Sequence, residues 1–258
     1  MPHQGNCNPD QLPLRTNLRG DIRTAEIAGE QFKKRFGNRR LGSSYTHILT
    51  KDTGIVRQSI LLYIRSVHFP RSFPIDVMHA ILLNNVPLLY RIWSSEIELQ
   101  GNHAIPSNDL AQIGSAMAKA RAHVPTSLGR APRDISKHFR SFKAAEWKGW
   151  LLYYGCPLLH THLNAPYLAN FRTLSKFFLL HSSLANFIGR IYYHTTQFKI
   201  QDIEKIRRLC SKFVRDFERL YYRKKQECLH VCRINIHSLL HLAQQIEVIL
   251  SLKLSAPF

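Results

Sequence analysis

The sequence predicts a mainly α-helical protein, a multi-helix domain with little or no sheet. Three observations carry this prediction. Apolar residues recur at steps of three and four along most of the second half of the chain, as in helices that bury one face. No run of strand character is comparable in length. Finally, 45% of the 258 residues are hydrophobic, which is enough to bury a substantial core.

Three regions follow one another along the chain. Residues 1–19 contain prolines and asparagines without a hydrophobic period, which is typical of a disordered tail. Residues 20–68 are predicted to form a basic helical lead-in, and residues 69–258 the main helical domain. A basic cluster around Gly37 in the lead-in is either a solvated helix end or a nuclear-localisation and phosphate-binding patch. Its members are Lys33, Lys34, Arg35, Arg39 and Arg40.

The main domain is predicted to begin with an apolar helix from about Ile75. Pro87 must kink or divide this helix, because proline lacks the backbone donor and clashes with the preceding turn. A small-residue helix over 107–121 is expected to be capped by Ser107 or Asn108. The segment 124–140 is predicted to be a basic loop, and its four basic residues are candidates for DNA binding. They are Arg130, Arg133, Lys137 and Arg140.

Four further helices are predicted over residues 142–154, 165–193, 200–222 and 234–250. The third has the clearest period, and its apolar face consists of Ile203, Ile206, Cys210, Phe213, Phe217 and Leu220. Its opposite face is charged and carries Lys205, Arg207, Arg208, Lys212, Arg215 and Arg219. Aromatic residues in the first helix are either core or a strip on which bases stack. They are Phe142, Trp147, Trp150, Tyr153 and Tyr154.

The charge balance predicts a polyanionic partner. Thirty-six Lys and Arg residues against 17 Asp and Glu leave a formal charge of +19. Nucleic acid is the expected partner, because dispersed cations that neutralise phosphates release counterions. No apolar run approaches the roughly 18–20 residues that span a bilayer, and the first residues do not form a signal peptide. Five scattered cysteines fit a reducing compartment, so we expect a soluble intracellular protein without a membrane partner.

Two constellations contain chemically active side chains. Asp76 and His79, three residues apart, share a helix face and could meet each other, a metal ion or a phosphate. The alternative is a carboxylate at a helix N-terminus beside a hydrogen-bonded histidine. The second set, C-x3-C-x4-H-x3-H, comprises Cys228, Cys232, His237 and His241. It has zinc-ligand types, but its central gap is too short for a zinc finger, so no metal site is predicted.

Five segments occur in the order that resembles the Plavaka branch of the CACTA/EnSpm-type DNA transposases. The hallmark of that branch is a Pro-Phe-Asp-x-Met-His segment followed by an apolar helix that ends in tryptophan. Here this segment is FPRSFPIDVMHAILLNNVPLLYRIW, residues 69–93. The other four are VPTSLGRAPRDIS, FKAAEWKGWLLYYGCPLL, VRDFERLYY and INIHSLLHLAQQIE, and the similarity covers roughly residues 17–250.

The resemblance implies nuclear excision and reinsertion of DNA by an RNase H-like core, in which three carboxylates hold two Mg²⁺ or Mn²⁺ ions. Asp76 and His79 match the family motif beside that centre, and Glu146 matches a recurrent acidic position in an inserted helical region. The strands with the first two acids would precede this chain, and the last Glu would follow it. We therefore expect a helical insertion that is catalytically incomplete, without a metal cofactor of its own, whose partners are DNA and other transposase chains.

Two alternatives remain open at the level of sequence. The chain could be an active metal-dependent transposase or nuclease in which Asp76, Glu146 and Asp109 or Asp134 converge on a metal. It could also be a domesticated helical adaptor that binds protein or RNA without chemistry. A phosphate-binding loop, a dinucleotide-binding loop and a hydrolase nucleophile elbow are all missing from the sequence.

Overall fold

The computed structural model describes residue 64 and residues 73–125, 130–190 and 200–254. The chain divides into two compact units, Met1–Pro74 and Ile75–Phe258, and the described helices belong to the second. The predicted tail, nearly all of the lead-in and the basic cluster from Lys33 to Arg40 lie outside the described residues. Within the described residues the chain forms helices and no strand, so the mainly α prediction is confirmed.

In the first half of the unit, short α-helices alternate with π-helical and 3₁₀ segments. The π-helical segment η3 (Met78–Asn85) continues into α3 (Val86–Trp93). Next come α4 (Ser107–Lys119), the 3₁₀ turn η4 (Ala120–His123), α5 (Ile135–His138) and the 3₁₀ turn η6 (Phe139–Ser141). A third group consists of α6 (Ala144–Gly149), the π-helical η7 (Trp150–Tyr154) and α7 (Gly155–Leu159).

The second half contains the long helices. They are α8 (Ala165–Arg190) and α9 (Ile200–Phe217), and α9 continues into the π-helical η8 (Glu218–Tyr222). The 3₁₀ turn η9 (Gln226–Val231) leads to α10 (Ile234–Ser238), the 3₁₀ turn η10 (Leu239–His241) and α11 (Leu242–Leu254). All four helices predicted beyond residue 142 are therefore present in the described residues, and the first, third and fourth contain an internal change of winding.

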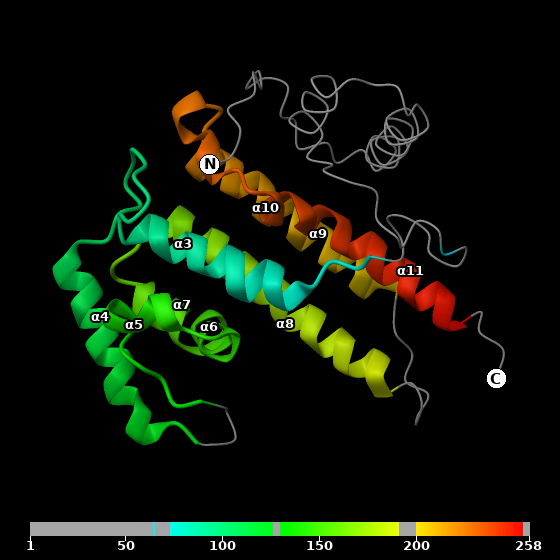
Figure 1. The fold of residues 1–258 in the computed structure, drawn as a ribbon, viewed down its shortest axis with the longest axis horizontal. Helices are drawn as coiled ribbons and strands as arrows, with labels where there is room; N and C mark the ends of the chain where they lie inside the picture. Colours follow the sequence, from blue (N-terminus) through cyan, green and yellow to red (C-terminus); the bar gives the residue numbers. More distant parts are fainter. Residues whose placement is uncertain (1–63, 65–72, 126–129, 191–199, 255–258) are drawn as a thin grey trace. The chain divides into compact units, whose positions relative to one another are not determined.

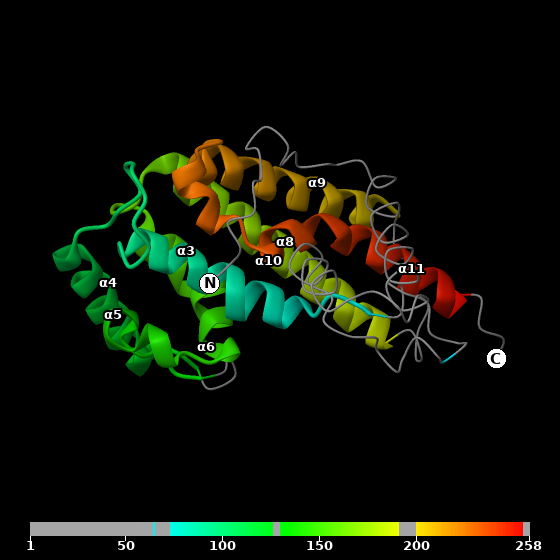
Figure 2. The same ribbon diagram turned by 45° about the horizontal axis from the view of Figure 1, so that its top comes forward.

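Helices α8, α9 and α11 lie side by side, whereas α4, α5, α6 and α7 gather at one end of the unit (Figures 1 and 2). Helix α8 runs along α9, and α9 also contacts η10 and α11. The η3 segment packs on α6 and α10, which joins the first half of the unit to the second. The apolar face of α9 predicted from the sequence period is buried as expected.

Aromatic side chains from both halves meet in the core. Trp93 of α3 and Phe171 of α8 are fully buried, and their ring centroids are 5.3 Å apart. The indole N–H of Trp93 donates to the Tyr221 hydroxyl of η8 over 3.0 Å, which gives a buried polar group the partner it needs. Among the five aromatics of the helix predicted over 142–154, Phe142, Trp147 and Trp150 are buried, so they belong to the core.

Glycine allows a close approach between α7 and α8. A Cβ atom on Gly155 would lie 2.6 Å from the Phe171 ring, well inside van der Waals contact. Pro87 is accommodated differently. It lies in the first turn of α3, where a missing backbone donor is tolerated, so it divides the helix by a change of winding from π to α.

Two local predictions were wrong. Helix α4 begins at Ser107 with Pro106 as its N-cap, so neither Ser107 nor Asn108 caps it. The segment predicted as a basic loop contains the helix α5, whose first turn is capped by the Asp134 carboxylate through the Ser136 N–H at 3.0 Å. Four residues are too few to show a helical period. Among the described residues, no helix has the length and apolarity needed to cross a bilayer.

Candidate functional site

Asp76 and His79 form a pair at the start of η3. The Asp76 Oδ2 atom lies 2.5 Å from His79 Nδ1, and its Oδ1 accepts the backbone N–H of His79 over 3.1 Å. Both side chains are more than half exposed. The hydrogen bonds from the His79 ring and backbone lower the pKa of the Asp76 carboxyl. The carboxylate therefore both caps the helical segment and holds the imidazole.

Glu146 is buried and bound on both of its oxygen atoms. Arg133 reaches Oε1 through Nε at 2.5 Å and Oε2 through Nη2 at 3.0 Å, a bidentate arrangement. The backbone N–H of Lys143 donates to Oε2 over 2.9 Å, and Arg130 Nη1 lies 3.8 Å away. Burial alone would raise the pKa of Glu146, but the hydrogen bonds from Arg133 and Lys143 and the charges of Arg133 and Arg130 leave it lowered. Glu146 thus closes the first turn of α6 and anchors the segment before α5.

Arg133 also forms hydrogen bonds to Ser141 within the protein. Its Nη1 and Nη2 donate to the hydroxyl and carbonyl oxygens of Ser141 over 3.3 and 3.2 Å. The guanidinium also lies 5.2 Å from the centroid of the Phe142 ring. This residue, a DNA-binding candidate by sequence, therefore has a structural role in the fold.

The other three basic candidates of this region are exposed but paired. Arg130 lies near Glu146, Lys137 lies 3.5 Å from Asp134, and Arg140 lies 3.8 Å from Glu96. Their side chains are 61%, 73% and 77% exposed, so solvent and ions reach them. We call Arg130, Arg133, Lys137 and Arg140 the α5 basic group.

The structure brings together some predicted residues and gives the others separate partners. Arg130 and Arg133 of the α5 basic group meet Glu146, although no sequence pattern links them. Asp109 lies 3.3 Å from the His162 ring, and Asp134 caps α5. Across the described parts of the chain, no group of three or more His, Cys, Asp or Glu residues could hold a metal ion.

A second basic surface, absent from the sequence-based candidates, lies along α9. Five cations follow one another at steps of three and four residues, and all five are exposed. Because the opposite face of α9 is buried, they form one row facing solvent. This α9 basic stripe consists of Lys205, Arg208, Lys212 and Arg215 of α9 and of Arg219 in η8, which continues α9.

The stripe is long and only partly neutralised. At 1.5 Å per residue, the distance from its first to its last member is about 21 Å. Arg208 lies 3.2 Å from Glu204, and Asp216 lies 2.6 Å from Lys212 and 3.3 Å from Arg219. Among the described residues no ion pair is formed by Lys205 or Arg215. Five cations therefore face two acids.

Arg207 separates the stripe from the packed face of α9. It pairs with Glu204 on its own helix and with Glu247 of α11, so it ties the two helices together. The sequence contained the signal for the stripe, since Lys and Arg recur there at helical steps. Charged faces usually serve only solubility, and the sequence could not show that the row is continuous and open.

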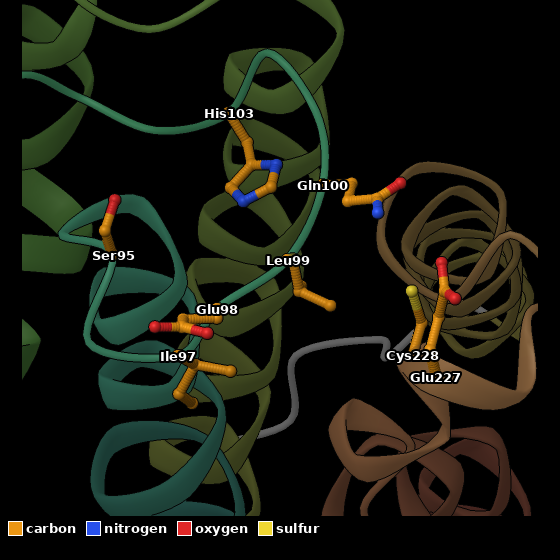
Figure 3. Close-up of a pocket in the computed structure, with 8 residues that line it drawn as sticks. All are labelled: Ser95, Ile97, Glu98, Leu99, Gln100, His103, Glu227 and Cys228. Atoms are coloured by element: carbon orange, nitrogen blue, oxygen red, sulfur yellow. The ribbon is translucent and has the colours of Figure 1, made fainter.

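A cavity of about 450 Å³ lies beside the loop that follows α3 (Figure 3). The buried His103 ring lines it, and burial together with the charge of Arg223 lowers the pKa of that ring. Ser95, which lines the cavity, has a left-handed backbone conformation with φ 59°, and so does Arg223, four positions before the lining residue Glu227, with φ 55°. The other lining residues are Ser95, Ile97, Glu98, Leu99, Gln100, Glu227 and Cys228.

The cavity has carboxylates at Glu98 and Glu227, and Figure 3 shows them approaching it from different segments. Its acidic groups suit a cation better than a phosphate, so it does not extend either basic surface. The transposase resemblance remains a prediction based on the five motifs. No protein-family model matches this chain, and neither a curated protein nor a solved structure matches it.

Proposed function

We propose that this chain is a transposase-derived helical domain that associates with DNA through the phosphate backbone and does not cut DNA by itself. The observation that carries the proposal is the α9 basic stripe, a row of five exposed cations on a helix whose other face is fixed in the core. The formal charge of +19 supports the same partner over the length of the chain. A nuclear location fits this function.

The geometry of the stripe suits a duplex. DNA presents one negative charge per about 1.7 Å of its axis, so a row of about 21 Å faces roughly a dozen phosphates. The stripe's ion pairs with Glu204 and Asp216 link residues of the same helix at the surface. Such pairs contribute little and exchange readily for contacts to phosphate. Flexible cations in one row position a protein on DNA without reading its bases, so binding should be insensitive to sequence.

The acids that match the transposase motifs have structural partners. Asp76 holds His79 at a helix start, and Glu146 is bound by Arg133 and the Lys143 backbone. In this proposal these residues stabilise the helical domain, while metal-held acids of an intact transposase would come from elsewhere. The competing hypothesis, an active Mg²⁺- or Mn²⁺-dependent nuclease that uses Asp76, is tested by the same experiment.

The experiment measures binding of the full chain to a fluorescein-labelled duplex by anisotropy, over a series of salt concentrations. The test variant replaces three stripe cations by glutamine: Lys205→Gln, Arg208→Gln and Arg215→Gln. A matched control removes three charges from the α5 basic group: Arg130→Gln, Lys137→Gln and Arg140→Gln. If each stripe cation contacts one phosphate, the slope of log K against log salt should become less negative by about 2.7 in the test variant.

The control variant should retain most of the wild-type slope. Equal losses in the two variants would mean that the charge acts diffusely, and a loss confined to the control would move the interface to the α5 basic group. Both results contradict the assignment to α9. The same samples are incubated with Mn²⁺ and the duplex is analysed for strand cleavage. Cleavage that disappears in Asp76→Ala would overturn the proposal that the chain does not cut DNA.

A further inference from the structure

His237 and His241 point their Nε2 atoms at each other across the junction of α10 and η10. The two nitrogen atoms are 3.1 Å apart, and the ring centroids are 5.0 Å apart. His237 is in the last turn of α10 and His241 closes η10. Both side chains are half-buried, so they are accessible to a small ion. The nitrogen pair lies outside both basic surfaces and outside the residues that carry the proposed function.

We propose that this histidine pair binds a borderline divalent transition-metal cation, of the class of Cu²⁺, Zn²⁺ and Ni²⁺. Neutral imidazole is a preferred ligand for these ions. With metal–nitrogen bonds of about 2.0–2.1 Å, a 3.1 Å separation of the two nitrogens corresponds to an N–metal–N angle of about 98°. That angle lies between the right angle of tetragonal copper sites and the tetrahedral angle of zinc sites.

The backbone around the pair is fixed by packing, which reduces the ordering needed for binding. Ile236 and Leu239, which alternate with the histidines along the chain, are 4% and 1% exposed. The Asn85 side chain donates to the carbonyl of Asn235 over 3.1 Å and ties α10 to the η3 segment. The Ser238 hydroxyl donates to the same carbonyl over 3.0 Å. The two imidazoles are therefore presented by a segment that is already held in place.

The nitrogen pair also satisfies a second geometry, a hydrogen bond in which one ring N–H donates to the other ring. Metal binding displaces that shared proton from Nε2, and the donor ring then carries its proton on Nδ1, so both rings bind the metal as neutral imidazoles. Cys228 and Cys232 do not join the histidines, because these four residues are all described and no group of three possible ligands lies together. The protein thus supplies two ligands, and water or an external donor completes the coordination. Moderate affinity and an open coordination sphere are expected.

The test uses the untagged full chain, since a polyhistidine tag would bind the same ions. Cu²⁺ is titrated calorimetrically into the wild-type protein and into His237→Gln, His241→Gln and the double variant. His230→Gln is the matched control, because His230 is exposed on the neighbouring turn η9 and its ring lies within hydrogen-bond distance of a backbone carbonyl, that of Glu227. Circular dichroism confirms that all variants retain their helical content.

The strongest Cu²⁺ equivalent of the wild-type protein should weaken at least tenfold in each single variant and in the double variant, and stay unchanged in His230→Gln. The electron paramagnetic resonance spectrum of that equivalent should show two nitrogen ligands. Zn²⁺ should raise the thermal midpoint of the wild-type protein and not that of the double variant. Equal Cu²⁺ affinity in wild type and double variant would show that the rings form a hydrogen bond only. If a variant loses helical content, the two-nitrogen spectrum and the Zn²⁺ shift of the wild type decide the matter, and their absence overturns the proposal.

Discussion

The α5 basic group and the α9 basic stripe are built from the same residue types, yet their acidic partners lie in different surroundings. In the α5 group, Glu146 is buried and binds Arg133 through two hydrogen bonds. On α9, Glu204 and Asp216 lie on the same helix as the cations they pair with, and their side chains are 44% and 16% exposed, against 3% for Glu146. A buried acid binds its cation into the fold, whereas a surface acid leaves its cation available to an outside anion. The location of the counter-charge therefore separates a structural basic cluster from a binding surface.

The largest effect is expected from Glu146→Gln. This change keeps the shape of the side chain but leaves the Arg133 guanidinium without its charge partner. Removing one member of a buried pair typically costs 3–5 kcal/mol, and because Arg133 is 32% exposed we expect the low end, about 3 kcal/mol. The free energy of unfolding is measured with urea. Glu204→Gln, which breaks only surface pairs on α9, should change it by less than about 0.5 kcal/mol. Similar losses in the two variants would remove the distinction between the regions.

Replacing one cation in each region tests the same difference between the two basic surfaces. Arg133→Gln leaves Glu146 buried with fewer donors, and we expect a loss of about 2 kcal/mol in the free energy of unfolding. Arg215→Gln should leave stability within about 0.5 kcal/mol of wild type, because Arg215 is exposed and forms no ion pair among the described residues. In DNA binding the order should reverse, with Arg215→Gln weaker than Arg133→Gln. If Arg215→Gln unfolded the protein more readily than Arg133→Gln, the stripe would be part of the fold and not a binding surface.

A smaller effect is expected from removing an acid of the stripe. Asp216 pairs with Lys212 and Arg219, so Asp216→Asn should free both cations for phosphate. The salt slope of DNA binding should become more negative, by up to about 0.9 for each additional phosphate contact. Asp134→Asn in the α5 region is the matched change, and it should weaken α5 without increasing DNA affinity. An Asp216→Asn variant that bound DNA no more tightly than wild type would show that the paired cations do not take part.

The sequence predicted the helices whose apolar pattern is contained in one continuous stretch of the chain. Helices α8 and α9 follow directly from the apolar steps, and the buried face of α9 was identified residue by residue. The four-residue α5 was missed because it spans little more than one helical turn, which is too short for an apolar position to recur. The π-helical segments η3, η7 and η8 were missed because apolar spacing does not distinguish a π turn from an α turn inside a buried helix.

The candidate site was predictable in composition but not in its contacts. Glu146 and Arg133 are separated by 13 positions along the chain, and no periodicity connects them, so their ion pair depends on how the segment before α5 lies against α6. The facing of His237 and His241 was predictable from their i, i+4 spacing, whereas the exclusion of the two cysteines was a question of tertiary structure. The stripe was visible as charge, and only the burial of the opposite face showed that it forms a single open row.

The carboxyl groups of Glu146 and Glu218 should change the stability of the protein with opposite signs as the pH rises. The pKa of Glu146 is lowered in the folded protein, so its contribution is present above the ordinary carboxyl range and is lost as the pH falls through its folded pKa. Burial raises the pKa of Glu218, the first residue of η8, to about 7, with the charge of Lys224 opposing the shift. Its contribution is present at low pH and is lost as the pH rises toward and through about 7. In urea unfolding between pH 4 and pH 8, Glu218→Gln should remove the decline toward neutral pH, whereas Glu146→Gln should flatten the acid side. A Glu218→Gln profile identical in shape to the wild type would mean that this carboxyl is ionised across the whole range, as a solvent-exposed member of the α9 surface would be.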